Sequence, residues 1–265
     1  MGARPPPMAG TLVTPYVDTV DVAGIAFRIS CRYPKPGFWA RSRPEFLTAR
    51  APDVVVAMTY DGNFPRPARD TASDASRVQR RGRALLLTTA YYRATADLQC
   101  GRVAVRIAAG FGVANLMRTL AALWLLERGT LLLRAVRVGR DGATLACGIP
   151  EETLGVARSA AVAGYLAVTP GPAGVSTRLT PFVDGEGPLP ARREGCARVL
   201  WVPGGVGPTR PGGAARAAGV LLPAIWQADR RRAALVRTLD LATRIVTTLR
   251  CVEVGAQEEA GVAVG

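Results

Sequence analysis

Histidine is absent from the 265 residues of this chain. Histidine is the side chain that most often acts as a general base, and it is also the commonest metal ligand. Its absence excludes catalytic mechanisms of the Ser-His and Cys-His kinds. Lysine is nearly absent as well, because Lys35 is the only one.

Paired cysteines are also missing. The five cysteines lie far apart and form no C-x-x-C pair, so neither a zinc site nor a disulfide framework has support in the sequence. We therefore expect no bound metal, and we interpret the cysteines as small buried hydrophobic residues of a cytoplasmic protein. These are Cys31, Cys100, Cys147, Cys196 and Cys251.

No long apolar run that would cross a membrane is present. The uncharged stretch at residues 159–177 is long enough, but Pro170 and Pro172 interrupt it. The first ten residues, MGARPPPMAG, lack the apolar core of a signal peptide. We predict a cytoplasmic protein without a membrane span.

The net charge of +14 comes almost entirely from arginine. A strongly positive protein attracts polyanions and acidic partners, but a GC-rich genome also favours arginine over lysine, and both explanations stay open. No basic stretch alternates with exposed aromatic residues, as a nucleic-acid-binding surface often does. We therefore favour a protein partner with an acidic surface over nucleic acid.

Hydrophobic patterning divides the chain into a flexible arm (1–19), a β-rich subdomain (20–112), a core region (113–254) and a tail (255–265). In the β-rich part, runs such as PDVVVAMTY and GRVAVRIAAG predict strands of an antiparallel sheet. Helical spacing then predicts a helix over 115–129, with Asn115 as N-cap and Gly129 as its end.

Further elements are predicted in the core region. The runs TLLLRAVRV and ATLACG are typical of two strands joined by the turn GRDG, and residues 154–164 are typical of a helix rich in small residues. Glycine and proline predict turns and irregular structure over 169–198. Residues 228–250 predict an amphipathic helix whose apolar face carries Leu235, Leu239, Ala242, Ile245 and Leu249.

The order of these segments resembles that of the bacterial HPr kinase/phosphorylase family. The similarity runs from about Leu120 to Val254 and is carried by ERGTLLLRAVRVGRDGATLACG, TPF at 180–182, ARVLWV and LDLATRIVTTLRCVEV. The resemblance implies an α/β protein with a phosphoenolpyruvate-carboxykinase-like P-loop core behind the β-rich half. It also implies nucleotide-dependent phosphorylation of serine in a small protein or peptide.

The phosphate-binding loop departs from the family pattern G-x-x-x-x-G-K-[ST]. In a working loop, backbone N–H groups surround the phosphates, the lysine bridges them, and the hydroxyl binds magnesium. Here Gly148 is the first glycine, but other residues occupy the remaining positions. Thr153 stands for the second glycine, Leu154 for the lysine and Gly155 for the hydroxyl residue, and Glu151 and Glu152 lie inside the loop.

The resemblance therefore implies a pseudokinase, with no cofactor, acting as a structural or adaptor subunit or as part of a larger complex. Arg134 occupies the position of the family's histidine in LLLHA, and we expect it to pair with Glu151 or Glu152. Two other interpretations stay open. One is an active enzyme with a rearranged nucleotide or pyrophosphate site that uses Arg134, Asp184 and Glu186, and the other is a basic module associated with nucleic acid.

Two groups of residues are candidates for binding a partner. Arginine and tryptophan are enriched where proteins bind one another most tightly. The first group lies on the predicted C-terminal helix, where a solvated helix face is the favoured interpretation and partner binding is the alternative. This first group is Arg230, Arg231, Arg232 and Arg237, and the second group is Phe38 and Trp39.

Overall fold

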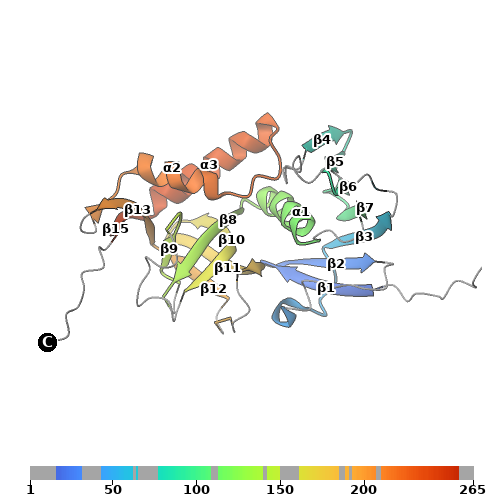
Figure 1. The fold of residues 1–265 in the computed structure, drawn as a ribbon, viewed down its shortest axis with the longest axis horizontal. Helices are drawn as coiled ribbons and strands as arrows, with labels where there is room; N and C mark the ends of the chain where they lie inside the picture. The colour runs from blue at the N-terminus through green and yellow to red at the C-terminus, as the bar shows by residue number, and fades with distance from the viewer. Residues whose placement is uncertain are drawn as a thin grey trace, which may run out of the picture.

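The computed structural model contains two mixed β-sheets and three α-helices in its described part (Figure 1). The structure describes residues 16–31, 43–61, 64, 77–108, 113–139, 142–149, 161–184, 189–190, 193–206 and 210–256.

The first sheet has seven strands in the order β1-β2-β3-β7-β6-β5-β4. Buried and exposed residues alternate along β3 and β7, as expected for a sheet with one face in the core. The sequence predicted an antiparallel sheet, which is wrong in the middle, because β2–β3 and β3–β7 are parallel pairs. The strands are β1 (Tyr16–Val22), β2 (Ile25–Cys31), β3 (Val54–Asp61), β4 (Arg77–Arg81), β5 (Ala84–Thr88), β6 (Tyr92–Asp97) and β7 (Arg102–Ala108).

The second sheet has eight strands in the order β12-β11-β10-β8-β9-β13-β15-β14. Strands β9, β13 and β15 pair in parallel, and the strands on both sides of them pair antiparallel. The strands are β8 (Leu131–Val138), β9 (Thr144–Ala146), β10 (Val162–Gly171), β11 (Gly174–Val183), β12 (Glu194–Ala197), β13 (Val199–Val206), β14 (Arg210–Pro211) and β15 (Arg250–Ala256).

The expected α/β class with a phosphoenolpyruvate-carboxykinase-like core is wrong. Strands dominate both halves of the described chain, and three α-helices are too few for a balanced α/β core. The difference arises largely after residue 160. The expected helix at 154–164 gives way to strand β10 from Val162 onward, and the rest of that helix lies outside the described residues.

The stretch 169–198 is also more regular than its glycine and proline content predicted. Strands β10 and β11 form a hairpin in which Gly171 pairs with Gly174, and β12 adds to its edge. Gly174 has a φ of +149°, a backbone conformation that favours glycine. A glycine at this turn can therefore connect the two long strands. Glycine and proline therefore mark the turn of a hairpin here, and they do not interrupt the strands on either side of it.

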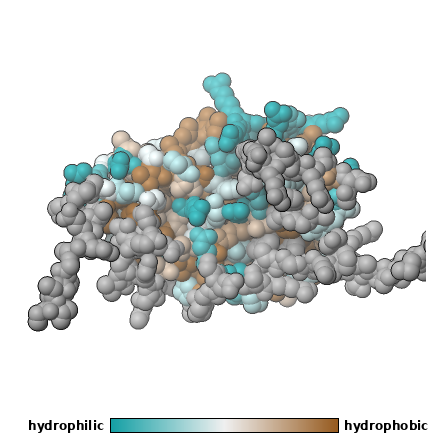
Figure 2. Space-filling model, in the orientation of Figure 1, coloured by the Kyte–Doolittle hydropathy of each residue, from teal (hydrophilic) through white to brown (hydrophobic). Residues whose placement is uncertain are grey.

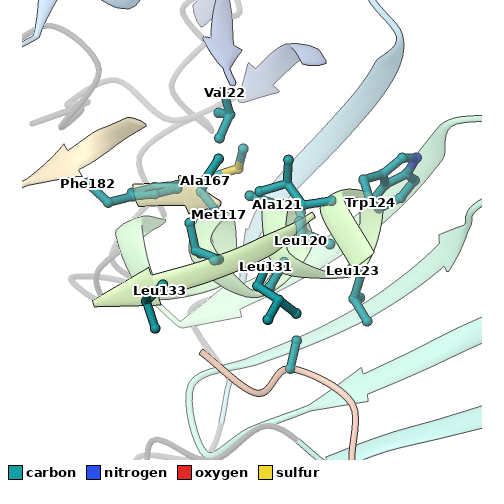
Figure 3. Packing of buried hydrophobic residues seen from close by; sticks show 14 of the residues in the cluster. Val22, Met117, Leu120, Ala121, Leu123, Trp124, Leu131, Leu133, Ala167 and Phe182 are labelled. Carbon is teal, nitrogen blue, oxygen red and sulfur yellow. The ribbon is translucent and has the colours of Figure 1, made fainter. Parts of the chain in front are cut away.

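Helix α1 (Val113–Glu127) lies between the two sheets and gives the molecule a shared core (Figure 3). Met117 and Leu120 lie between Val22 of the first sheet and residues of the second, such as Leu133. The helix ends where the sequence predicted, since Gly129 has a φ of +71°. Its described part begins at Val113, which places Asn115 inside the helix, so the prediction of Asn115 as N-cap is wrong.

Helices α2 (Ala214–Ala224) and α3 (Arg232–Thr248) cover one face of the second sheet (Figure 1). The sequence predicted α3 but not α2. The predicted apolar face of α3 is partly wrong, because Leu239 is 51% exposed and Leu241 is buried in its place. No helix in the described ranges is long and apolar enough to span a bilayer.

Candidate functional site

An open cavity of about 760 Å³ lies between the second sheet and α2. Its walls come from β8, from the segment that follows β9, from the start of β10, from the end of β11, and from the C-terminal half of α2. Cavities of this size commonly hold small molecules. Gly148 lines the cavity, and the family resemblance likened this glycine to the first position of a phosphate-binding loop.

Gly148 turns the chain away from β9 in a conformation that requires glycine. Its φ is +67°, where residues with a Cβ are strained. A Cβ at this position would lie 3.0 Å from Val220 Cγ1 and 3.5 Å from Pro203 Cγ. The close approach of α2 and β13 therefore adds a second reason for glycine here.

Arg134 and Asp184 are the two oppositely charged residues among the described cavity walls. Strand β8 is buried along its length except at Arg134, whose side chain therefore reaches solvent. Asp184 follows directly after β11, which places its carboxylate 3.9 Å from Arg134 Nη2. Their side chains are 65% and 53% exposed, so this ion pair contributes about 0–1 kcal/mol to stability.

The interpretation of Arg134 as a partner of Glu151 or Glu152 is not addressed by the structure. Glu151, Glu152, Thr153, Leu154 and Gly155 lie outside the described residues. The ion pair that the structure does describe joins Arg134 to Asp184. Two of the three residues named for a rearranged nucleotide site therefore lie together, while Glu186 is not described.

Aromatic side chains form the wall next to α2. Tyr165 and Trp226 meet edge to face, with their ring centroids 5.4 Å apart. The Arg118 guanidinium lies 5.0 Å from the Tyr165 ring and 4.8 Å from the Trp226 ring, and such cation–π contacts hold rings in place. The sequence did not predict this cluster, because its three residues are distant in the chain.

Groups suited to catalysis are scarce around the cavity. Cys147 precedes Gly148, but burial raises the pKa of its thiol to about 12, so the reactive thiolate does not form at neutral pH. Within the described ranges, no group of three or more Cys, Asp and Glu residues is placed to hold a metal ion. Among the described lining residues, few groups could activate a nucleophile.

The arginines proposed for partner binding differ in their surroundings. Arg231 is held by the buried Asp229, whose two carboxylate oxygens accept hydrogen bonds from the Arg231 backbone and side chain. The side-chain bond to Asp229 raises the Arg231 pKa further, despite partial burial. Arg231 therefore anchors the start of α3, and its role as a partner-binding residue is not supported by these contacts.

The other three arginines reach the surface. Arg237 Nη1 lies 2.9 Å from Glu127 Oε2 and so ties α3 to α1. Arg230 and Arg232 are exposed, and neither has an ion-pair partner among the described residues. The remaining candidates, Phe38 and Trp39, lie outside the described residues.

Sequence signals for the cavity were few. Gly148 and Arg134 were found through the family resemblance, and Asp184 through its chemistry alone. The aromatic wall and α2 gave no comparable signal; Pro223 lies inside α2, although proline disfavours helix interiors.

Comparison with known proteins adds no family assignment. No protein-family model matches this sequence, and no curated protein is significantly similar to it.

Proposed function

We propose that this protein is a pseudokinase, similar to HPr kinase/phosphorylase in the order of its sequence segments, that acts as an adaptor for a protein partner with an acidic surface. The observation that carries the proposal is the charge of the cavity beside Gly148. Among the described lining residues, Arg134 faces Asp184 at 3.9 Å, so their charges balance, while the nearby Arg118 packs against the Tyr165 and Trp226 rings.

This charge balance disfavours a nucleotide. A phosphate about 4 Å from Arg134 would gain about 4 kcal/mol at an effective dielectric of 20, and an equally close Asp184 would cancel that gain. The sequence adds Glu151 and Glu152 next to Gly148 and places Leu154 where the family has lysine. These residues would therefore give a triphosphate no net electrostatic attraction to the site.

A surface for the partner is available on α3. Arg230 and Arg232 are exposed near its start, and Val236 and Leu239 on its outer side are 59% and 51% exposed. In the described part of the surface, hydrophilic and hydrophobic residues lie side by side along the edge formed by α3 (Figures 1 and 2). Apolar residues beside unpaired arginines suit a partner that presents carboxylates around an apolar contact.

An active enzyme with a rearranged nucleotide or pyrophosphate site is a second candidate function, because Arg134 and Asp184 form an ion pair at the cavity. An arginine can stabilise a transferring phosphoryl group, and a carboxylate can bind magnesium or accept a proton. This candidate requires measurable nucleotide or pyrophosphate binding, whereas the pseudokinase requires none.

Partner docking is tested by affinity purification from native cells with quantitative mass spectrometry. We expect the double variant Arg230→Glu/Arg232→Glu to lose at least about tenfold of a specific co-purifying protein, as for charge pairs at interfaces. The control Arg77→Glu/Arg81→Glu changes the net charge equally on strand β4, where both residues are exposed. Equal recovery with both variants would contradict docking on α3.

A further inference from the structure

The cavity beside Gly148 has a charged part and an apolar part, and the pseudokinase proposal assigns no ligand to either. Its mouth carries Arg134 and Asp184, both more than half exposed. Its remaining described lining residues are uncharged and include Ile149, Val220 and the rings of Tyr165 and Trp226, against which the Arg118 guanidinium packs. A ligand that fits both parts needs a charged head and an apolar body.

The head must carry both signs of charge. An anion that approaches Arg134 meets the Asp184 carboxylate at nearly the same distance, and a cation that approaches Asp184 meets the guanidinium. A head with adjacent positive and negative groups satisfies both residues at once. The exposed ion pair is weak, so exchanging it for two contacts to a ligand costs little.

An α-amino acid has this head, because its ammonium and carboxylate groups are attached to the same carbon. The carboxylate suits the fork of N–H donors on arginine, and the ammonium suits a carboxylate acceptor. A large apolar side chain would then cover the Tyr165 and Trp226 wall, where aromatic surfaces bind apolar groups well. The cavity, at about 760 Å³, has room for such a side chain.

We infer that the cavity is a binding site for a zwitterionic α-amino acid with a large apolar side chain. Arg134 binds the carboxylate, Asp184 binds the ammonium group, and the aromatic wall selects the side chain. This site is separate from the exposed outer side of α3, so the inference goes beyond partner docking and does not depend on it.

Calorimetric titration of the full chain tests the site with L-phenylalanine as the probe. Three related compounds each remove one feature: N-acetyl-L-phenylalanine lacks the ammonium group, L-phenylalaninamide lacks the carboxylate, and glycine lacks the side chain. We expect L-phenylalanine to bind and each of the three to bind at least about tenfold more weakly. Equal affinity for the capped compounds, or no binding of L-phenylalanine at about 10 mM, would overturn the inference.

Variants assign the binding to the two charged residues. Arg134→Gln and Asp184→Asn should each weaken L-phenylalanine binding at least about tenfold, and the charge swap Arg134→Asp/Asp184→Arg should recover part of the loss. Glu194→Gln is the matched control, because Glu194 forms a similarly exposed ion pair with Arg178 outside the cavity. A thermal melt of each variant verifies its fold, and unchanged binding in both folded single variants would contradict the assignment.

Nucleotide binding remains a separate measurement. Binding of L-phenylalanine without binding of Mg-ATP would support both proposals, while binding of neither would remove the amino-acid site and leave the pseudokinase proposal standing.

Discussion

Gly148 shows most clearly how one residue shapes the cavity. Its positive φ turns the chain out of the sheet, and its missing Cβ lets Val220 approach. The sequence identified this glycine as the first position of a phosphate-binding loop. The structure shows that backbone conformation and packing against α2 are sufficient reasons for it.

Gly148→Ala should destabilise the protein by about 2–3 kcal/mol, because strain in the left-handed region adds to the contact with Val220. Gly82→Ala is the matched control, since Gly82 has a φ of +61° and no atom within 4 Å of its would-be Cβ. The control should cost about 1–2 kcal/mol, from strain alone. Urea unfolding followed by circular dichroism measures both, and equal losses would show that the close packing has no energetic role.

Arg134 and Asp184 illustrate what residue types alone could not predict. Both were named as candidates from the sequence, but their pairing depends on β8 and the end of β11 lying on either side of β10. The family resemblance favoured Glu151 or Glu152 as the partner of Arg134, and both lie outside the described residues. Sheet order, which brings residues 50 positions apart together, was not readable from local patterns.

Helix α3 shows how much of a single element the sequence can predict: that a helix is present, but only part of its buried face. Its existence follows from the spacing of its apolar residues, and the structure confirms it at Arg232–Thr248. Its buried face is shifted, because Thr238 and Leu241 point inward while Val236 and Leu239 are exposed. With apolar residues distributed on more than one side, the pattern allowed two orientations, and packing against α1, α2 and the sheet selected one.

The start of α3 depends on Asp229, which accepts hydrogen bonds from Arg231 and is 5% exposed. Asp229→Ala should lower the free energy of unfolding by about 2 kcal/mol, because charged hydrogen bonds are lost and Arg231 is left unpaired. Asp240→Ala is the control, since Asp240 is exposed on the same helix and should change stability by less than about 0.5 kcal/mol. Similar losses in chemical denaturation would contradict the anchoring role.

At the scale of the whole molecule, two sheets share one core through α1. Phe27 of the first sheet packs edge to face against Trp124, with ring centroids 6.0 Å apart, and Arg178 of the second sheet donates a hydrogen bond to Ala23 O. Alternating patterns predicted most strands of the first half. They did not predict the parallel pairs or the β10–β11 hairpin, which depend on contacts between distant segments.

This architecture places the cavity at the junction of β8, β9, β10 and α2, and it keeps the exposed Arg230 and Arg232 near the start of α3 at the surface. The two surfaces can therefore act independently. A protein that uses the outer surface for a partner needs no chemistry in the cavity, which is the central claim for a pseudokinase.

Titration of the purified full chain with Mg-ATP by calorimetry tests that claim most directly. The triple variant Glu151→Gly/Glu152→Gly/Leu154→Lys is the comparison, because it removes the acidic residues and supplies the missing lysine. The account predicts no saturable heat for the natural chain at about 1 mM Mg-ATP and a gain of binding in the variant. Saturable binding of Mg-ATP by the natural chain, with transfer of its terminal phosphate to a serine, would contradict it.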